Sequence, residues 1–165
     1  MKKRLDNVSR HFSLVSKDEV EKLHGGHAIF FGSPNHISPY ITYQFLRKYY
    51  GLPRRITTDI DDYDKVHWEY SLQSRHSILT VYDWKLFSWN IGVAYPYTVF
   101  THNIGTQMCK KVDDKIRKCE KMAEPEARLL LSYITKYAKG RSSLVAKNIQ
   151  ILCARHNLQK RDRIA

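Results

Sequence analysis

Long apolar runs and cysteine are both scarce in this sequence. No run of about 18 apolar residues occurs, so no segment resembles a membrane-spanning helix. The three cysteines, Cys109, Cys119 and Cys153, are few and odd in number, which does not suggest the disulfide framework of a small secreted protein. Met1–Arg4 is basic, but Leu5–Asn7 follows where a signal peptide would have its apolar segment. We therefore expect an intracellular protein that does not enter a membrane.

Acidic residues are also few. The chain has 16 Asp and Glu against 28 Lys and Arg, which gives a formal net charge of +12. The excess lies mainly in residues 105–165, which hold fifteen Lys and Arg and six acidic residues, whereas residues 25–104 are nearly neutral and rich in aromatics. A positive field of this size attracts polyanions, of which nucleic acid is the commonest. We expect the partner to be DNA, RNA or a protein complex that handles nucleic acid.

The middle of the chain has the pattern of β-strands. Apolar and polar residues alternate over 66–72 and 87–95, and 78–84 is a short apolar segment between them. Another short apolar segment, 27–31, reads as a buried strand. Because short loops join the three successive strands, we expect an antiparallel meander. The sequence therefore predicts an α+β protein with a three-stranded antiparallel meander and flanking helices.

Helix-terminating residues bound two of the flanking helices. Ser16 with Glu19 fits a capping box, and Gly25–Gly26 is expected to end that short helix. Ser38 precedes Pro39, which is a favourable first helical residue, and Gly51 is expected to end this second helix after Tyr50.

The last third of the chain changes to helical periodicity. One helix is expected around 108–119, a second begins at Pro125 and ends at Gly140, and Ser142 caps a third. The sequence thus divides into an α+β body over 1–103 and a basic helical region over 104–165 that packs on it.

Basic side chains on these helices are the candidate binding residues. They are Lys110, Lys111, Lys115, Arg117, Lys118, Lys121, Lys136, Lys139, Arg141, Lys147, Arg155, Lys160, Arg161 and Arg163. Such side chains contact phosphates without reading sequence, which favours a non-enzymatic binding protein. A helix-turn-helix around Gly140–Ser142, with Ser142, Ser143, Lys147 and Asn148 facing the groove, is one alternative. A small phage-type or accessory regulator that binds a nucleic-acid-processing protein is another.

A further alternative is enzymatic. Asp83-Trp84-Lys85 ends an apolar strand and follows an acidic cluster over 59–64. This pattern resembles the second half of the motif of PD-(D/E)xK nucleases. The resemblance implies that Asp62 or Asp64, with Asp83, would bind Mg²⁺, and that Lys85 would position the attacking water. The competing interpretation is a turn between two strands, with Asp83 and Lys85 solvated.

Other catalytic and cofactor sites find little support. No P-loop, dinucleotide or nucleophile-elbow motif occurs, and the histidines and cysteines lack zinc-ligand spacing. We expect no metal or cofactor apart from Mg²⁺ in the nuclease alternative. Several tyrosines could either stack on unpaired bases or fill a core: Tyr40, Tyr43, Tyr49, Tyr50, Tyr95 and Tyr97.

Overall fold

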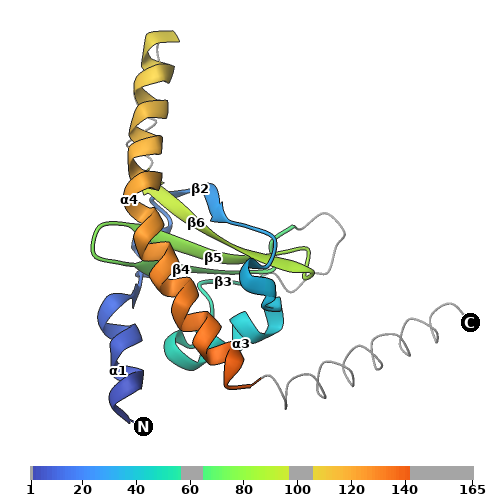
Figure 1. The fold of residues 1–165 in the computed structure, drawn as a ribbon. Coiled ribbons are helices and arrows are strands. Elements are labelled where there is room, and N and C mark those ends of the chain that lie inside the picture. Colours follow the sequence, from blue (N-terminus) through green and yellow to red (C-terminus); the bar gives the residue numbers. More distant parts are fainter. Residues whose placement is uncertain (1, 57–64, 97–105, 142–165) are drawn as a thin grey trace, which may run out of the picture.

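The computed structural model describes residues 2–56, 65–96 and 106–141, which form an α+β fold around an antiparallel sheet (Figure 1). The six strands are β1 (Ser13–Leu14), β2 (Leu23–Phe30), β3 (Arg55–Ile56), β4 (Trp68–Gln73), β5 (Ile78–Trp84) and β6 (Ser88–Pro96). The helices are α1 (Lys2–His11), α2 (Lys17–Val20), the 3-10 helix η1 (Pro34–His36), α3 (Pro39–Tyr50) and α4 (Thr106–Lys139).

The sheet confirms the antiparallel pairing of the three strands expected from sequence, but it is larger than a three-stranded meander. Its strand order is β1-β4-β5-β6-β2, and β3 pairs with the first residues of β4. The meander is the β4-β5-β6 part, in which Leu72 lies opposite Leu79 and Val81 opposite Ile91. β1 and β2 extend it on either side because their backbones pair with the outer edges of β4 and β6.

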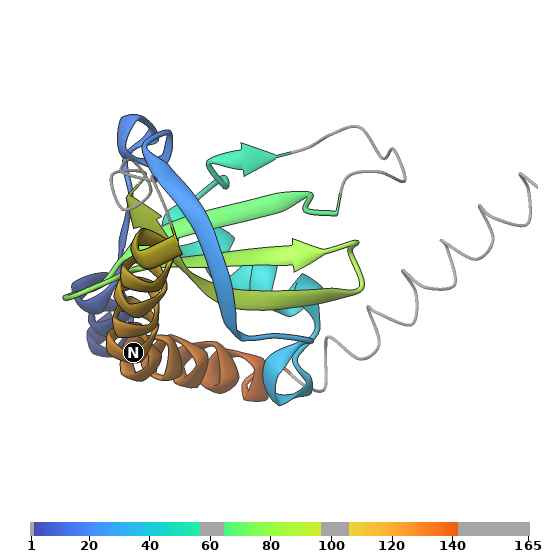
Figure 2. The ribbon, with the colours of Figure 1, turned by 90° about the horizontal axis from the view of Figure 1, so that it is seen from above.

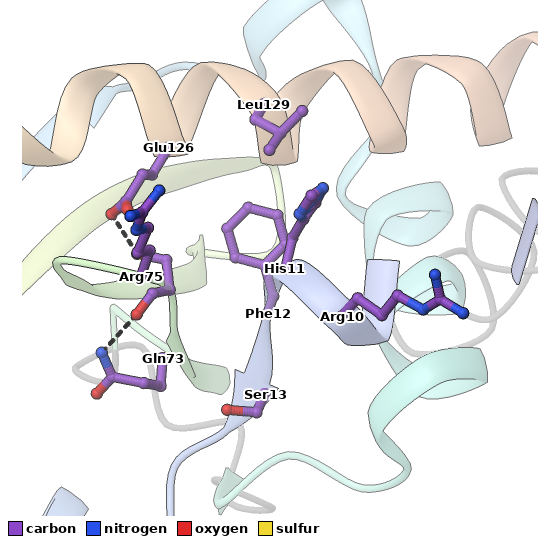
Figure 3. Close-up of a pocket in the computed structure, with 9 residues that line it drawn as sticks. Arg10, His11, Phe12, Ser13, Gln73, Arg75, Glu126 and Leu129 are labelled. Carbon is purple, nitrogen blue, oxygen red and sulfur yellow. Dashed lines mark hydrogen bonds between the residues drawn. The ribbon is translucent and has the colours of Figure 1, made fainter. Parts of the chain in front are cut away.

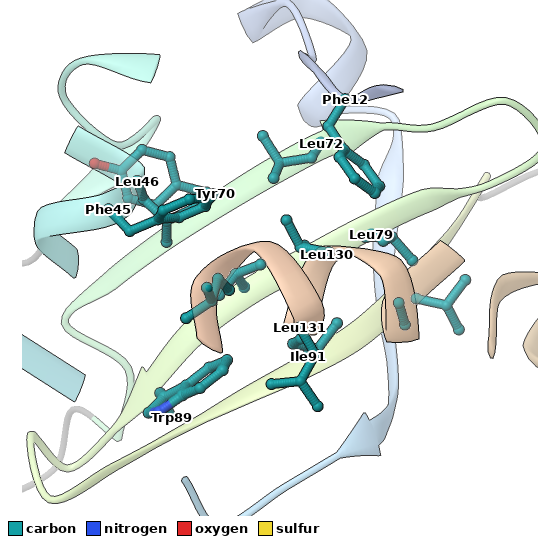
Figure 4. Packing of buried hydrophobic residues seen from close by; sticks show 14 of the residues in the cluster. Phe12, Phe45, Leu46, Tyr70, Leu72, Leu79, Trp89, Ile91, Leu130 and Leu131 are labelled. Atoms are coloured by element: carbon teal, nitrogen blue, oxygen red, sulfur yellow. The ribbon is translucent and has the colours of Figure 1, made fainter. Parts of the chain in front are cut away.

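One face of the sheet carries the core. Side chains at alternate positions of the strands, among them Tyr70, Leu79 and Trp89, are completely buried. Helices α1, α3 and α4 contribute the opposing side chains, and Figure 4 shows Leu130 and Leu131 of α4 facing the strands. The aromatic middle of the sequence and the first half of its basic C-terminal third therefore share one core.

Helix α3 has the ends that the sequence predicted. The Ser38 hydroxyl accepts a hydrogen bond from the Ile41 N–H at 3.2 Å, and Pro39 occupies the first turn. Gly51 ends the helix with φ +75°, a conformation that glycine adopts without steric cost. Ser16 also caps α2 as predicted, by accepting from the Glu19 N–H. The expectation that Gly25–Gly26 ends that helix is wrong, because both glycines lie within β2.

The prediction of separate helices around 108–119 and from Pro125 is also wrong. α4 is one 34-residue helix with Pro125 inside it. Proline removes one backbone hydrogen bond and bends a helix, and Figures 1 and 2 show α4 changing direction between its yellow first part and its orange second part. The second part packs on the sheet, and the first turns of the helix extend beyond it (Figure 1). The predicted third helix from Ser142 lies outside the described residues.

Candidate nucleic-acid interface

Helix α4 carries five basic residues that share one property: each is exposed and makes no hydrogen bond or ion pair with another described residue. They are Lys115, Arg117, Lys118, Lys121 and Lys136. The opposite side of the helix is held on the sheet by buried residues such as Ala127 and Leu130. Arg117, Lys118, Lys121 and Lys136 therefore lie on the side turned away from the core, together with the exposed Asp114, whereas Lys115 lies two turns before the buried Ala123 on the same side as that residue. We call these five residues the α4 basic face.

Three further basic residues of this region have partners. Arg128, which the sequence analysis did not single out, pairs with Glu124 at 2.7 Å and lies 5.4 Å from the centre of the Phe30 ring. Arg141 lies over the Tyr137 ring at 4.6 Å, and Lys139 also has an interaction partner. These three cations are therefore less available to a polyanion than the α4 basic face.

Seven of the predicted binding residues have side chains outside the described part of the structure. Lys110 and Lys111 belong to helix α4, but their side chains are outside the described part. Lys147, Arg155, Lys160, Arg161 and Arg163 lie in residues 142–165, beyond the described residues.

Asp83 has a clear structural role in the fold. Its Oδ1 accepts the N–H groups of His67 at 2.6 Å and Trp68 at 2.9 Å, and its Oδ2 accepts from His67 Nδ1 at 2.9 Å and the Leu86 N–H at 3.0 Å. The side chain is 0% exposed, so the expectation that Asp83 is solvated is wrong. A carboxylate has about four lone-pair sites, and all of them are used here. A metal ion could bind Asp83 only by displacing one of these donors.

The predicted turn between the two strands is present. The Phe87 N–H donates to the Trp84 carbonyl at 3.1 Å, and Lys85 and Leu86 between them have φ of 53° and 62°. Two successive positive φ angles are typical of a type I′ hairpin turn, which favours Asn and Gly rather than Lys and Leu. Lys85 is exposed while Asp83 is buried, so the two do not share an environment. Asp62 and Asp64 lie outside the described residues.

The same turn exposes large apolar side chains. Phe87 is 85% exposed, and Trp84 and Leu86 are also exposed; we call these three residues the apolar tip. Lys65 lies 5.5 Å from the centre of the Trp84 ring. Phe31, at the same end of the sheet just after β2, is 77% exposed. Apolar side chains gathered in this way are common at interaction surfaces.

The candidate tyrosines are mostly engaged in the fold. The Tyr50 hydroxyl donates to the Phe12 carbonyl at 3.1 Å, and the Tyr95 hydroxyl donates to Glu120 at 3.1 Å. Burial raises the pKa of both phenols above the usual value, and the Glu120 carboxylate raises that of Tyr95 further. Tyr43 and Tyr49 pack against rings of the core, Tyr40 is exposed, and Tyr97 is outside the described residues.

A cavity of about 510 Å³ opens where the end of α1, the β4–β5 turn and α4 meet (Figure 3). Arg10 and His11 line it from α1, Arg75 from the turn, and Glu126 and Leu129 from α4. Sequence reasoning missed this site, because its residues come from three segments that are each unremarkable alone.

The described residues contain no cluster of three or more His, Cys, Asp or Glu that could hold a metal ion. Among the described helices, none combines the length and the apolar character needed to cross a membrane. Comparison with protein-family models, with curated proteins and with solved structures gives no match.

Proposed function

We propose that this is an intracellular, non-enzymatic nucleic-acid-binding protein that holds the phosphate backbone of DNA or RNA on the α4 basic face. The observation that carries the proposal is the exposed position of these five cations without partners in the described part of the chain. Cations already engaged in ion pairs gain less from a phosphate than free ones, because the existing pair must be broken.

The position of the helix supports this role. The first part of α4 extends beyond the sheet, so a polyanion can approach it from several sides (Figure 1). The helix begins in a region of the chain, 105–165, that holds fifteen Lys and Arg. Phosphate contacts of this kind give affinity and orientation, with little sequence specificity.

Charge-neutral variants test the assignment to α4. The triple variant Arg117→Gln, Lys118→Gln and Lys121→Gln should bind a fluorescein-labelled 12-nucleotide strand at least tenfold more weakly than the wild type, measured by fluorescence anisotropy. The matched control removes three exposed cations elsewhere: Lys17→Gln, Lys22→Gln and Lys85→Gln. Equal losses in both variants would contradict a specific role of α4, because only net charge would then matter.

A second candidate function is regulation of a nucleic-acid-processing protein, and the apolar tip favours it. Exposed aromatic residues are enriched at protein interfaces. In this case a purified partner should remain bound after nuclease treatment, and the variant Leu86→Ser with Phe87→Ser should release it. Binding that disappears with nuclease treatment would argue against this function.

The nuclease alternative can be tested directly. The hydrogen bonds around Asp83 favour a structural role, while its partners in the motif, Asp62 and Asp64, lie outside the described residues. If the protein is a nuclease, the wild type should cleave a nucleic-acid strand in the presence of Mg²⁺. The variant Asp83→Asn should lose this cleavage while remaining folded, as judged by circular dichroism.

A further inference from the structure

The cavity between α1, the β4–β5 turn and α4 combines three kinds of surface. Arginines stand at its sides, Arg75 from the turn and Arg10 from α1. In Figure 3 the side chains of His11, Leu129 and the buried Phe12 lie between them. Polar groups of the β4–β5 turn complete the lining. A volume of about 510 Å³ lies within the range of about 300–1,000 Å³ that is usual for ligand sites.

The two arginines are free to bind a ligand. Within the described part of the chain, neither Arg10 nor Arg75 makes a hydrogen bond or an ion pair. The Glu126 carboxylate is already engaged, because it accepts from the Ser74 hydroxyl and from the His76 N–H at 3.0 Å. Its bonds hold the turn that carries Arg75. The cavity therefore presents two guanidinium groups without partners among the described residues, and the backbone that carries Arg75 is fixed from α4.

The directions of the arginines decide what kind of anion fits. Figure 3 shows Arg10 pointing away from Arg75 and Glu126, on the far side of His11. Two diverging guanidinium groups cannot clamp one phosphate, but each can pair with a separate phosphate. Glu126 lies at the Arg75 end of the cavity, where its hydrogen bonds with Ser74 and His76 direct the carboxylate towards the turn. A chain of phosphates that passes along the cavity fits this arrangement better than a single small anion.

The middle of the cavity suits a flat ring. The His11 ring is held by the Tyr133 ring, with 6.1 Å between centroids, and Leu129 adds an exposed apolar side chain. Bases of unpaired nucleic acid stack on ring and apolar surfaces, whereas bases in a duplex are not accessible in this way. Lys136 lies seven residues after Leu129, two helical turns or about 10 Å further along the same face, and extends the positive charge beyond the cavity.

We propose that this cavity seats one unpaired base of a single nucleic-acid strand, while Arg10 and Arg75 bind the phosphates on either side of it. The inference rests on the proposed function and deepens it, because it makes the preferred ligand a single strand. The α4 basic face alone would accept single and double strands alike.

Anisotropy with three probes tests the inference: a labelled 12-nucleotide strand, the same strand in a duplex, and a labelled abasic strand of equal length. The wild type should bind the strand at least tenfold more tightly than the other two. Arg10→Gln with Arg75→Gln should reduce single-strand affinity about tenfold and leave duplex binding within twofold. It should also lower the slope of log K against log salt by about 1.4, since each single-strand phosphate contact contributes about 0.7. His11→Ala with Leu129→Ala should remove the preference for the strand over its abasic form.

Lys85→Gln, at the opposite end of the sheet, is the single-charge control and should leave the strand preference unchanged. Equal binding of strand, duplex and abasic strand would overturn the cavity assignment while leaving the α4 basic face in place. If inorganic phosphate or a free mononucleotide displaced the labelled strand at a concentration similar to that of an unlabelled 12-nucleotide strand, the two-phosphate arrangement would be overturned. Absence of binding to every probe would contradict the proposed function itself.

Discussion

The two ends of the sheet each use a carboxylate to fix a turn, but they present opposite surfaces. At one end Asp83 is completely buried and holds the β5–β6 hairpin, which exposes the apolar tip. At the other end Glu126 reaches from α4 to the β4–β5 turn, which exposes Arg75 beside the cavity. The same type of interaction therefore stabilises two turns that expose different surfaces. Because Asp83 is buried and Glu126 is partly exposed, we expect Asp83 to contribute more to the free energy of unfolding.

The largest effect is expected at Asp83. Asp83→Ala leaves the N–H groups of His67, Trp68 and Leu86 without their acceptor in a buried place, so it should lower the free energy of unfolding by about 3 kcal/mol. Urea denaturation measures this loss, and the midpoint of thermal unfolding should fall by about 6–12 °C. Asp83→Asn keeps one acceptor oxygen and should cost less. A loss below about 1 kcal/mol for Asp83→Ala would show that the carboxylate does not organise the hairpin.

A smaller effect is expected at Glu126. Its side chain is partly exposed, so water replaces the lost contacts when Glu126→Ala is made, and the free energy of unfolding should fall by about 1 kcal/mol. The same urea denaturation experiment allows the loss of unfolding free energy in Glu126→Ala to be compared with that in Asp83→Ala. Equal losses at Glu126 and Asp83 would contradict the difference in burial on which the comparison rests.

The hairpin should become more stable when its turn is changed to the residues that its backbone favours. Lys85→Asn with Leu86→Gly relieves the left-handed conformation of two residues and should raise the free energy of unfolding by about 1 kcal/mol. Gly51→Ala is the control in the opposite direction, because it introduces a side chain at φ +75°. Since the space around Gly51 is open, only backbone strain opposes the alanine, which should lower the free energy of unfolding by about 1 kcal/mol. A destabilised double variant would mean that the two side chains contribute more than the backbone strain costs.

The smallest effect is shared by both ends and appears at alkaline pH. Burial raises the pKa of Tyr82 near the hairpin, and of Tyr95 at the other end of the sheet, above the usual value of 10.0. A raised pKa in the folded state favours the neutral phenol, so this stability is complete below pH 10 and is lost as the pH rises above it. Denaturation at pH 8, 10 and 11 should show a decline only above pH 10. A free energy of unfolding that increases over that pH range would contradict the raised pKa of these phenols.

The parts of the fold that follow local rules could be predicted from the sequence. Alternating apolar residues located β4 and β6, and the Ser38, Pro39 and Gly51 signals located α3, because strand periodicity and helix capping depend on neighbouring residues alone. Helix α1 was missed because its sequence, KKRLDNVSRH, contains only two apolar residues, Leu5 and Val8, too few for a clear helical stripe. The proline in α4 was interpreted as a boundary because nothing local shows that packing on the sheet can keep a bent helix continuous.

The candidate site was predictable only in part. Charge located the residues of the α4 basic face, since Lys and Arg are concentrated in this part of the chain. Asp83 could not be interpreted correctly because its donors come from residues 67–68 and 86, which only the tertiary fold brings together. The cavity arises from α1, the β4–β5 turn and α4 for the same reason.

The salt dependence of strand binding tests the central claim most directly. Anisotropy of the labelled 12-nucleotide strand with the wild-type protein should be measured from 50 to 300 mM KCl. If the five residues of the α4 basic face hold phosphates, log K should fall linearly with log salt with a slope of about −3.5 or steeper. A slope near zero, or no binding at 50 mM KCl, would contradict the account.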